Sequence, residues 1–134
     1  MHFTVLGEPQ GKARARTVKN QFTGQTMSYT PEKTVLYENL IKMEYQAQCG
    51  GKFFGKGVPV GIEVTCWYKQ PKAKKKPMFP CKKPDMDNAL KAVTDALNGV
   101  AWYDDAQVVV AQVYKLWAAE QPSVKVRIWE VGRL

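Results

Sequence analysis

Residues 82–91 read Lys82-Lys83-Pro84-Asp85-Met86-Asp87-Asn88-Ala89-Leu90-Lys91, and the chain continues through Asp95, the turn Asn98-Gly99 and the pair Asp104-Asp105. All five aspartates of this 134-residue chain lie in that acidic window, although the formal net charge of the chain is +8. Like charges held close together cost free energy unless a positive group lies between them. Carboxylates are the hard oxygen ligands that Mg²⁺ or Mn²⁺ prefers, so the window indicates a divalent-metal site.

The acidic window also predicts local structure. Residues 88–98 have the apolar spacing of a helix, and Asn98-Gly99 is a stop signal. Pro84 biases the chain before it toward extended geometry, in which Asp85 and Asp87 point to one side. Asp104 or Asp105 returns to the start of this helix only if residues 100–105 fold back along it. In that case three oxygen donors converge.

Each acidic residue also has an ordinary structural explanation, and the sequence leaves both open. Asp85 and Asp87 are suited to satisfy the free N–H groups at a helix start. The pair Asp104-Asp105 is typical of a turn. Lys91 is placed to pair with Asp87 one helical turn earlier, and Asp95 reads as a surface charge.

The rest of the chain predicts a small α+β domain. Residues 2–6 alternate like a strand, and residues 7–29 read as a long polar loop. Thr30 as N-cap and Pro31 at the first helical position start a helix that Gly50-Gly51 ends. An apolar stripe is expected along one face of this helix, formed by Val35, Leu36, Leu40, Met43 and Ala47.

The C-terminal half predicts three further strands. Residues 58–68 alternate in the pattern of a strand, and the basic loop 69–84 precedes the acidic window. Residues 107–117 and 123–131 read as two antiparallel strands. The resulting order is β-α-β-α-β-β, which predicts a two-layer domain spanning 1–134, with two helices packed on one face of a mostly antiparallel or mixed sheet.

The positive charge indicates a polyanionic partner such as DNA. It gathers in two segments, 10–19 and 69–83, which contain no acidic residue. Each contact between such a residue and a phosphate would release counterions and add affinity. The candidate DNA-binding residues are Lys12, Arg14, Arg16, Lys72, Lys74, Lys75, Lys76, Lys82 and Lys83.

The composition excludes several classes of enzyme. His2 is the single histidine, which argues against Ser-His-Asp and Cys-His catalysis and against His-rich zinc sites. The three cysteines form no Cys-x-x-Cys pair, and the chain has no apolar run of membrane-spanning length and no secretory signal, so we expect a cytoplasmic protein. Residues 50–56 match part of a phosphate loop, but Gly57 follows and the surrounding element order is reversed, so we expect no nucleotide cofactor.

The pattern Asp85-x-Asp87-Asn88-x-x-Lys91-x-x-x-Asp95-x-Leu97, followed by Asp104-Asp105-Ala106-Gln107-Val108, resembles the signature of the RusA family of Holliday junction resolvases, common in phages and prophages. The basic run before the first aspartate and the strand predicted after the aspartate pair fit this resemblance. The motif covers residues 82–110, and the likeness in element order extends over most of the chain. The N-terminal half matches only loosely.

The resemblance implies a homodimeric, Mg²⁺-dependent, structure-selective endonuclease that resolves four-way DNA junctions by paired phosphodiester hydrolysis during recombination and repair. Mn²⁺ is a possible substitute. The metal-binding aspartates of that family match Asp85, Asp87 and Asp105, and its essential lysine matches Lys91. Asn88 is a candidate for holding a carboxylate in place, and Asp104 is a candidate either for orienting these carboxylates or for a fourth metal ligand. Two alternatives stay open: a non-catalytic basic DNA-binding module, and a metal nuclease that prefers flaps or replication forks.

Overall fold

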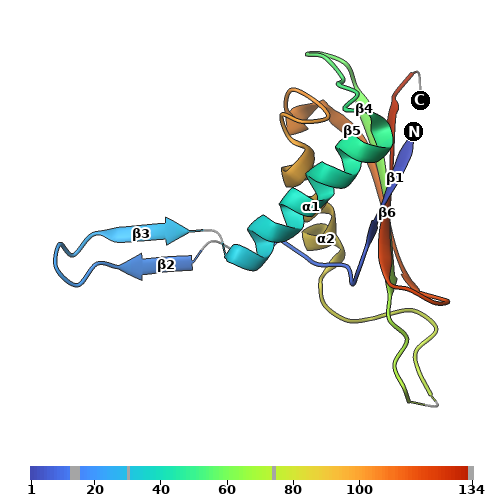
Figure 1. The fold of residues 1–134 in the computed structure, drawn as a ribbon, viewed down its shortest axis with the longest axis horizontal. Helices are drawn as coiled ribbons and strands as arrows, with labels where there is room; N and C mark the ends of the chain where they lie inside the picture. Colours follow the sequence, from blue (N-terminus) through green and yellow to red (C-terminus); the bar gives the residue numbers. More distant parts are fainter. Residues whose placement is uncertain (13–15, 30, 74, 133–134) are drawn as a thin grey trace.

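The computed structural model describes residues 1–12, 16–29, 31–73 and 75–132. The elements follow one another as β1 (His2–Leu6), β2 (Arg16–Lys19), β3 (Thr26–Tyr29), α1 (Glu32–Cys49), β4 (Val60–Tyr68), α2 (Met86–Leu97), the 3₁₀ helix η1 (Asp105–Gln107), β5 (Val108–Trp117) and β6 (Ser123–Glu130). Both helices lie on the same side of the main sheet (Figure 1), so the α+β class predicted from sequence is confirmed. Arg14, Lys74 and the expected cap Thr30 lie outside the described residues.

The main sheet is mixed and has the strand order β1-β6-β4-β5. Strand β6 is antiparallel to both β1 and β4, whereas β4 and β5 are parallel. Strands β5 and β6 run in opposite directions, as the sequence predicted, but they are not neighbours, because β4 lies between them. Parallel neighbours need a crossover connection, and the loop and α2 supply it between β4 and β5.

The core lies between this sheet and the two helices. The alternate β4 side chains Val60, Ile62, Val64 and Cys66 are all buried, as their spacing predicted. Ala89, Ala92, Val93, Ala96 and Leu97 of α2 pack into the same cluster. The opposite face of α2 carries Asp87, Lys91 and Asp95, so packing of the apolar face determines the direction in which these polar side chains point.

The buried face of α1 differs from the predicted stripe. Its buried residues are Thr34, Tyr37, Ile41 and Tyr45, whereas Leu36 and Met43 are each 61% exposed. The expectation was wrong because the spacing of aliphatic residues was counted without the two tyrosines, whose rings supply much of the buried surface. The end of the helix was predicted correctly: Gly50 adopts the left-handed conformation, with φ 63°.

The segment predicted as a polar loop, residues 7–29, contains a hairpin that projects from the body (Figure 1). Strands β2 and β3 pair antiparallel in a separate two-stranded sheet. The side chain of Asn20 closes the turn by accepting a hydrogen bond of 2.8 Å from the Phe22 N–H. Neither strand is apolar enough to stand out in the sequence. No helix in the described part of the chain is long and apolar enough to cross a membrane.

Candidate active site

The acidic window begins where α2 begins. Asp85 occupies the N-cap position with extended backbone angles, φ −64° and ψ 151°, and the Ala89 N–H donates to its carbonyl oxygen at 3.0 Å. The helix therefore starts at Met86, two residues before the predicted start. Asp87 is consequently in the first helical turn, and the extended geometry expected for both aspartates applies to Asp85 alone.

The carboxylate of Asp85 is not used to cap the helix. The structure shows no side-chain cap hydrogen bond at this end of α2. Instead the Lys83 ammonium donates to the two Asp85 carboxylate oxygens at 2.9 and 3.0 Å, and this holds the pKa of Asp85 below its usual value. The Asp85 side chain remains 54% exposed. Asp85 therefore does not satisfy a free backbone N–H at the helix start, and its carboxylate pairs with Lys83 instead.

A cavity of about 660 Å³ opens beside Asp85. Residues 9–12 form one wall and the start of α1 contributes a second. A third wall is formed by Lys83, Pro84, Asp85 and Asn88. The first and third walls meet closely at Gly11, because a Cβ atom there would lie 2.6 Å from the Pro84 Cβ. The Lys12 N–H also donates to the Asn88 carbonyl at 3.0 Å. The chain that leads into the β2–β3 hairpin is thus fastened to the start of α2.

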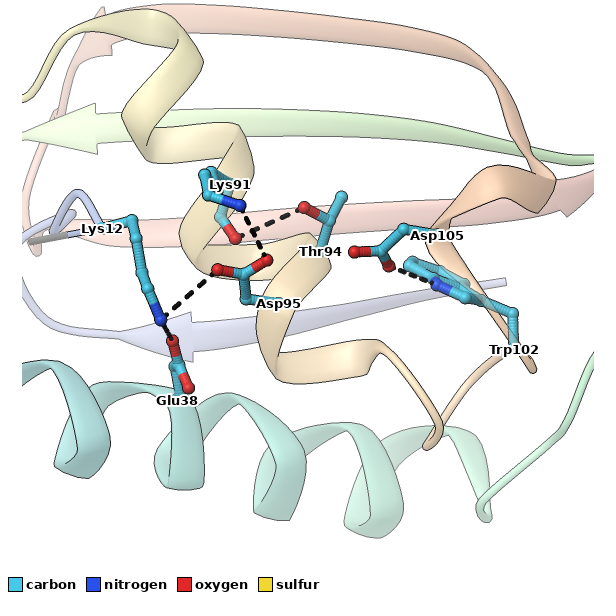
Figure 2. A network of polar contacts seen from close by, with 7 residues as sticks. All are labelled: Lys12, Glu38, Lys91, Thr94, Asp95, Trp102 and Asp105. Carbon is cyan, nitrogen blue, oxygen red and sulfur yellow. Dashed lines mark hydrogen bonds and ion pairs between the residues drawn. The ribbon is translucent and has the colours of Figure 1, made fainter. Parts of the chain in front are cut away.

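Lys12 lies at the centre of a polar network (Figure 2). Its ammonium is 2.6 Å from Glu38 of α1 and 3.3 Å from Asp95 of α2, and the three side chains are 16–22% exposed. The hydrogen bond to Glu38 raises the pKa of Lys12, and Asp95 adds to the effect. Lys12 therefore holds the two helices together.

Lys91, the candidate catalytic lysine, is on the exposed side of α2. Its ammonium is 3.2 Å from the Asp95 carboxylate, one turn further along the helix. The expected pairing with Asp87 is therefore replaced by a pairing with Asp95. Asp95 accepts contacts from both Lys12 and Lys91 (Figure 2), so it is part of the site rather than an isolated surface charge.

The adjacent residues Asp104 and Asp105 have different surroundings. Asp104 caps η1: its carboxylate accepts from the Ala106 N–H at 3.4 Å, and its own N–H donates to Gln107 at 2.9 Å. Asp105 instead accepts a hydrogen bond of 2.7 Å from the indole N–H of the buried Trp102. Its carboxylate is on the side of η1 that faces α2 (Figure 2).

The surroundings of Asp105 raise the pKa of its carboxyl group. Burial raises the pKa of Asp105, the nearby carboxylates of Asp95 and Asp104 act in the same direction, and the hydrogen bond from Trp102 opposes them. The Lys91 ammonium is also close enough to lower the pKa. These influences agree with the position of Asp105 beside the part of α2 that carries Lys91 and Asp95 (Figure 2).

The acidic side chains suit a divalent cation in their chemistry, but the predicted ligands are not assembled around one point. Carboxylate oxygens without histidine or cysteine favour Mg²⁺ or Mn²⁺. Within residues 1–12, 16–29, 31–73 and 75–132, however, no three Asp, Glu, His or Cys side chains form a group that could hold a metal ion. Asp87 and Asp95 are eight residues apart, about 12 Å along the helix axis, and Asp105 lies near Asp95. The assignment of Asp85, Asp87 and Asp105 as joint ligands stays a prediction.

The candidate DNA-binding lysines are mostly exposed. Lys72, Lys75, Lys76, Lys82 and Lys83 lie in the loop between β4 and α2, and all five are exposed. Lys82 is 3.4 Å from Glu8, and Lys76 donates to the side chain of Gln70. Arg16 begins β2. The basic loop therefore runs directly into the acidic window.

Comparison with known proteins identifies the family. The family model described as "Endodeoxyribonuclease RusA" matches residues 7–129. A protein of Bacillus subtilis (strain 168), described as "Uncharacterized protein YqaN", is 33% identical over 142 residues, covering 97% of this chain and 96% of the relative. The match includes the N-terminal half, which the sequence motif did not cover.

The exposed lysines of the loop between β4 and α2 are the electrostatic feature expected of a protein that binds DNA. The chain belongs to the RusA endodeoxyribonuclease family. It is an endodeoxyribonuclease, a hydrolase acting on DNA, of the Holliday junction resolvase type. Nucleases of this family generally depend on a divalent metal.

Three residues of the site were missed by sequence reasoning. Glu38 completes the Lys12 network from α1, and Trp102 donates to Asp105. Lys115 of β5 reaches the chain just before Asp85. Glu38 and Lys115 have no local signal because their partners are distant in sequence. Trp102, three residues before Asp105, offered a weak one: a buried indole usually donates its N–H to a nearby acceptor.

Proposed function

We propose that this protein is a Mg²⁺-dependent, structure-selective endonuclease that resolves four-way DNA junctions by paired hydrolysis of phosphodiester bonds. One observation carries the proposal: the carboxylate of Asp85, at the start of α2, makes no cap hydrogen bond and remains exposed at the end of a basic loop. A helix start that needed only a cap would use that carboxylate to accept a backbone N–H.

Asp85, Asp87 and Asp105 are the residues we propose to hold one or two Mg²⁺ ions. A bound cation of this kind lowers the pKa of a bound water and neutralises charge that develops on the phosphate. Because the described residues show no assembled group of three, the proposal requires these carboxylates to approach one another when cation and DNA bind. Asn88 and Asp104 would keep the carboxylates oriented.

Lys91 is the proposed cationic member of the site. Asp95 holds its ammonium on the side of α2 that Asp105 faces (Figure 2). From there, Lys91 would steady the scissile phosphate or the leaving oxygen. Its exposure supports this role, because a phosphate can reach the ammonium without disrupting the core.

The basic residues are proposed to bind the arms of the junction. Five of them are exposed in the loop between β4 and α2, namely Lys72, Lys75, Lys76, Lys82 and Lys83. Lys74, Lys12, Arg14 and Arg16 are proposed to bind DNA with them. Lys12 differs from the others because its ammonium already contacts two carboxylates. We therefore expect a smaller contribution to DNA affinity from Lys12 than from the loop lysines.

A homodimer is proposed because paired incisions require two active sites that face two strands. Exposed apolar side chains on α1 and β5 support an interface between copies, namely Val35, Leu36, Met43 and Val109. The cytoplasm is the proposed location, since it keeps cysteines reduced and the three cysteines are free.

The proposal is tested by incubating the protein with a labelled synthetic four-way junction, a fork and a linear duplex, each with Mg²⁺ and with EDTA. We expect symmetric nicks in the junction with Mg²⁺ and none with EDTA. Binding that is indifferent to EDTA and never followed by cleavage would identify a DNA-binding module instead. Faster cleavage of the fork than of the junction would identify a fork or flap nuclease.

A further inference from the structure

Lys115 of β5 contacts the chain that leads into the acidic window. Its ammonium donates to the carbonyl oxygen of Lys82 at 2.5 Å and to that of Pro84 at 2.9 Å. Pro84 directly precedes Asp85, so the second bond holds the peptide group that joins these two residues. Hydrogen bonds from a charged donor are roughly twice as strong as neutral ones.

This contact is important because the connecting loop has little structure of its own. The described residues between β4 and α2 contain no helix or strand, so the path of the loop depends on contacts with the body of the protein. Trp117, two residues after Lys115 on β5, donates its indole N–H to the Pro77 carbonyl at 2.8 Å. Strand β5 therefore fastens the loop at two places.

The ammonium of Lys115 lies over the aromatic ring of Tyr68. Its nitrogen is 5.5 Å from the centroid of the Tyr68 ring, and that ring is completely buried. A cation over the face of an aromatic ring is attracted by it, most strongly where water is excluded. Lys115 is itself only partly exposed. The carbonyl oxygens are thus held by a donor whose own position is fixed by the core.

We propose that Lys115 is a positioning residue for the nuclease site, which sets the direction in which the chain enters α2 and thereby the place of the Asp85 carboxylate. The inference rests on the proposed function, in which Asp85 holds the metal. Strand β5 begins directly after η1, which carries Asp105. Strand β5 therefore helps to position both aspartates. Asp105 is joined to β5 through the backbone, and Asp85 is held through the hydrogen bond from Lys115 to the Pro84 carbonyl.

The test compares Lys115→Met, which keeps the length of the side chain but cannot donate, with Lys115→Arg, which can donate to two carbonyls. Junction nicking is measured as a function of Mg²⁺ concentration. We expect Lys115→Met to raise the half-saturating Mg²⁺ concentration about tenfold or more, because residues that orient metal ligands typically contribute 10–100-fold to metal affinity or activity. Lys115→Arg should restore most of the loss, and junction binding in EDTA should be unchanged.

The matched control is Lys125→Met, which removes an exposed lysine from β6 by the same substitution. It should leave the Mg²⁺ dependence of nicking as in the wild type. A Lys115→Met protein with wild-type Mg²⁺ dependence would overturn the inference. So would a Lys115→Arg protein as defective as Lys115→Met while its thermal stability is normal.

Hydrogen exchange separates this inference from the proposed function. The Ala89 N–H donates to the Asp85 carbonyl, so its exchange reports on the first turn of α2. In Lys115→Met this amide should exchange faster than in the wild type or in Lys125→Met, whether or not the protein cuts DNA. Unchanged exchange would refute the positioning role. Absence of nicking by the wild type would refute the proposed function alone. If Lys115→Met does not fold, Lys115→Gln replaces it as the variant that loses the charged contact, because its side chain is shorter and neutral, and it is again compared with Lys115→Arg.

Discussion

Aspartates of one acidic window have different neighbours in the folded chain. Asp85 pairs with Lys83, Asp95 accepts from two lysines, Asp104 caps a turn and Asp105 accepts from a buried indole. A carboxylate already used by the backbone is less available to a cation than one that is not. The neighbours therefore separate Asp104, a turn residue, from Asp85 and Asp105.

The Lys12 network should contribute measurably to stability. Lys12→Met leaves Glu38 and Asp95 without their shared partner. We expect the loss of these half-buried ion pairs to lower the free energy of unfolding by about 1–2 kcal/mol at pH 7. Denaturation in urea measures the loss. Lys42→Met on α1 is the control and should change stability by less than about 0.5 kcal/mol. An equal effect of both substitutions would contradict a specific role for the network.

The same network predicts a dependence on pH. The pKa of Lys12 is raised in the folded protein, chiefly by the hydrogen bond to Glu38, so folding favours the charged ammonium. Its contribution is complete below the unfolded pKa of about 10.4 and is lost as the pH rises through the higher folded pKa. The difference in stability between wild type and Lys12→Met should therefore be constant from pH 7 to 9 and shrink above pH 10.5. A difference that grows in alkali would contradict this account.

At the scale of elements, the side chain of Trp129 on β6 lies against Gly61 of β4. A Cβ atom built there would lie 2.3 Å from the ring of Trp129 on β6. Gly61→Ala should therefore destabilise the protein by about 1–3 kcal/mol, the usual effect of overpacking. Gly55→Ala is the control, since a Cβ there meets nothing within 4 Å. Equal unfolding midpoints for the two variants would show that Trp129 moves aside without cost.

The elements with strong local patterns were predictable from sequence. The alternation along β4, the glycine stop of α1 and the helix in the acidic window all appear in the structure. The partners of the strands were not predictable, because β6 inserts between β1 and β4 through contacts distant in sequence. The β2–β3 hairpin was missed because its strands have four residues each and no apolar run.

The site was predictable in composition but not in arrangement. The spacing of Asp85, Asp87 and Lys91 indicates which side chains share the start of one helix. It does not show that Lys91 turns to Asp95, or that Asp105 meets α2 near its third turn. These contacts depend on how η1 folds back against the helix, and packing of Trp102 in the core decides that.

At the scale of the whole molecule, charge is expected to determine how tightly DNA binds. The basic loop should bind phosphates, and removal of one lysine–phosphate pair should reduce the slope of log affinity against log salt by about 0.9 on duplex arms. Replacing Lys74, Lys75 and Lys76 together with alanine should therefore flatten the slope by up to about 2.7 for three such pairs. Replacing Lys42, Lys52 and Lys56, outside the predicted DNA surface, removes the same charge as a control. An equal decrease in both variants would mean that net charge alone sets the affinity.

Carboxylates from two separate stretches of the chain are proposed to act in one reaction, and a single comparison tests this directly. The rate of junction nicking in Mg²⁺ and the affinity for the junction are measured for Asp85→Asn, Asp87→Asn and Asp105→Asn beside the wild type. We predict that nicking falls at least about 100-fold in each variant, while junction binding is retained or tightens because repulsion of phosphate is relieved. Nicking at the wild-type rate by Asp105→Asn, or by both Asp85→Asn and Asp87→Asn, would contradict the account.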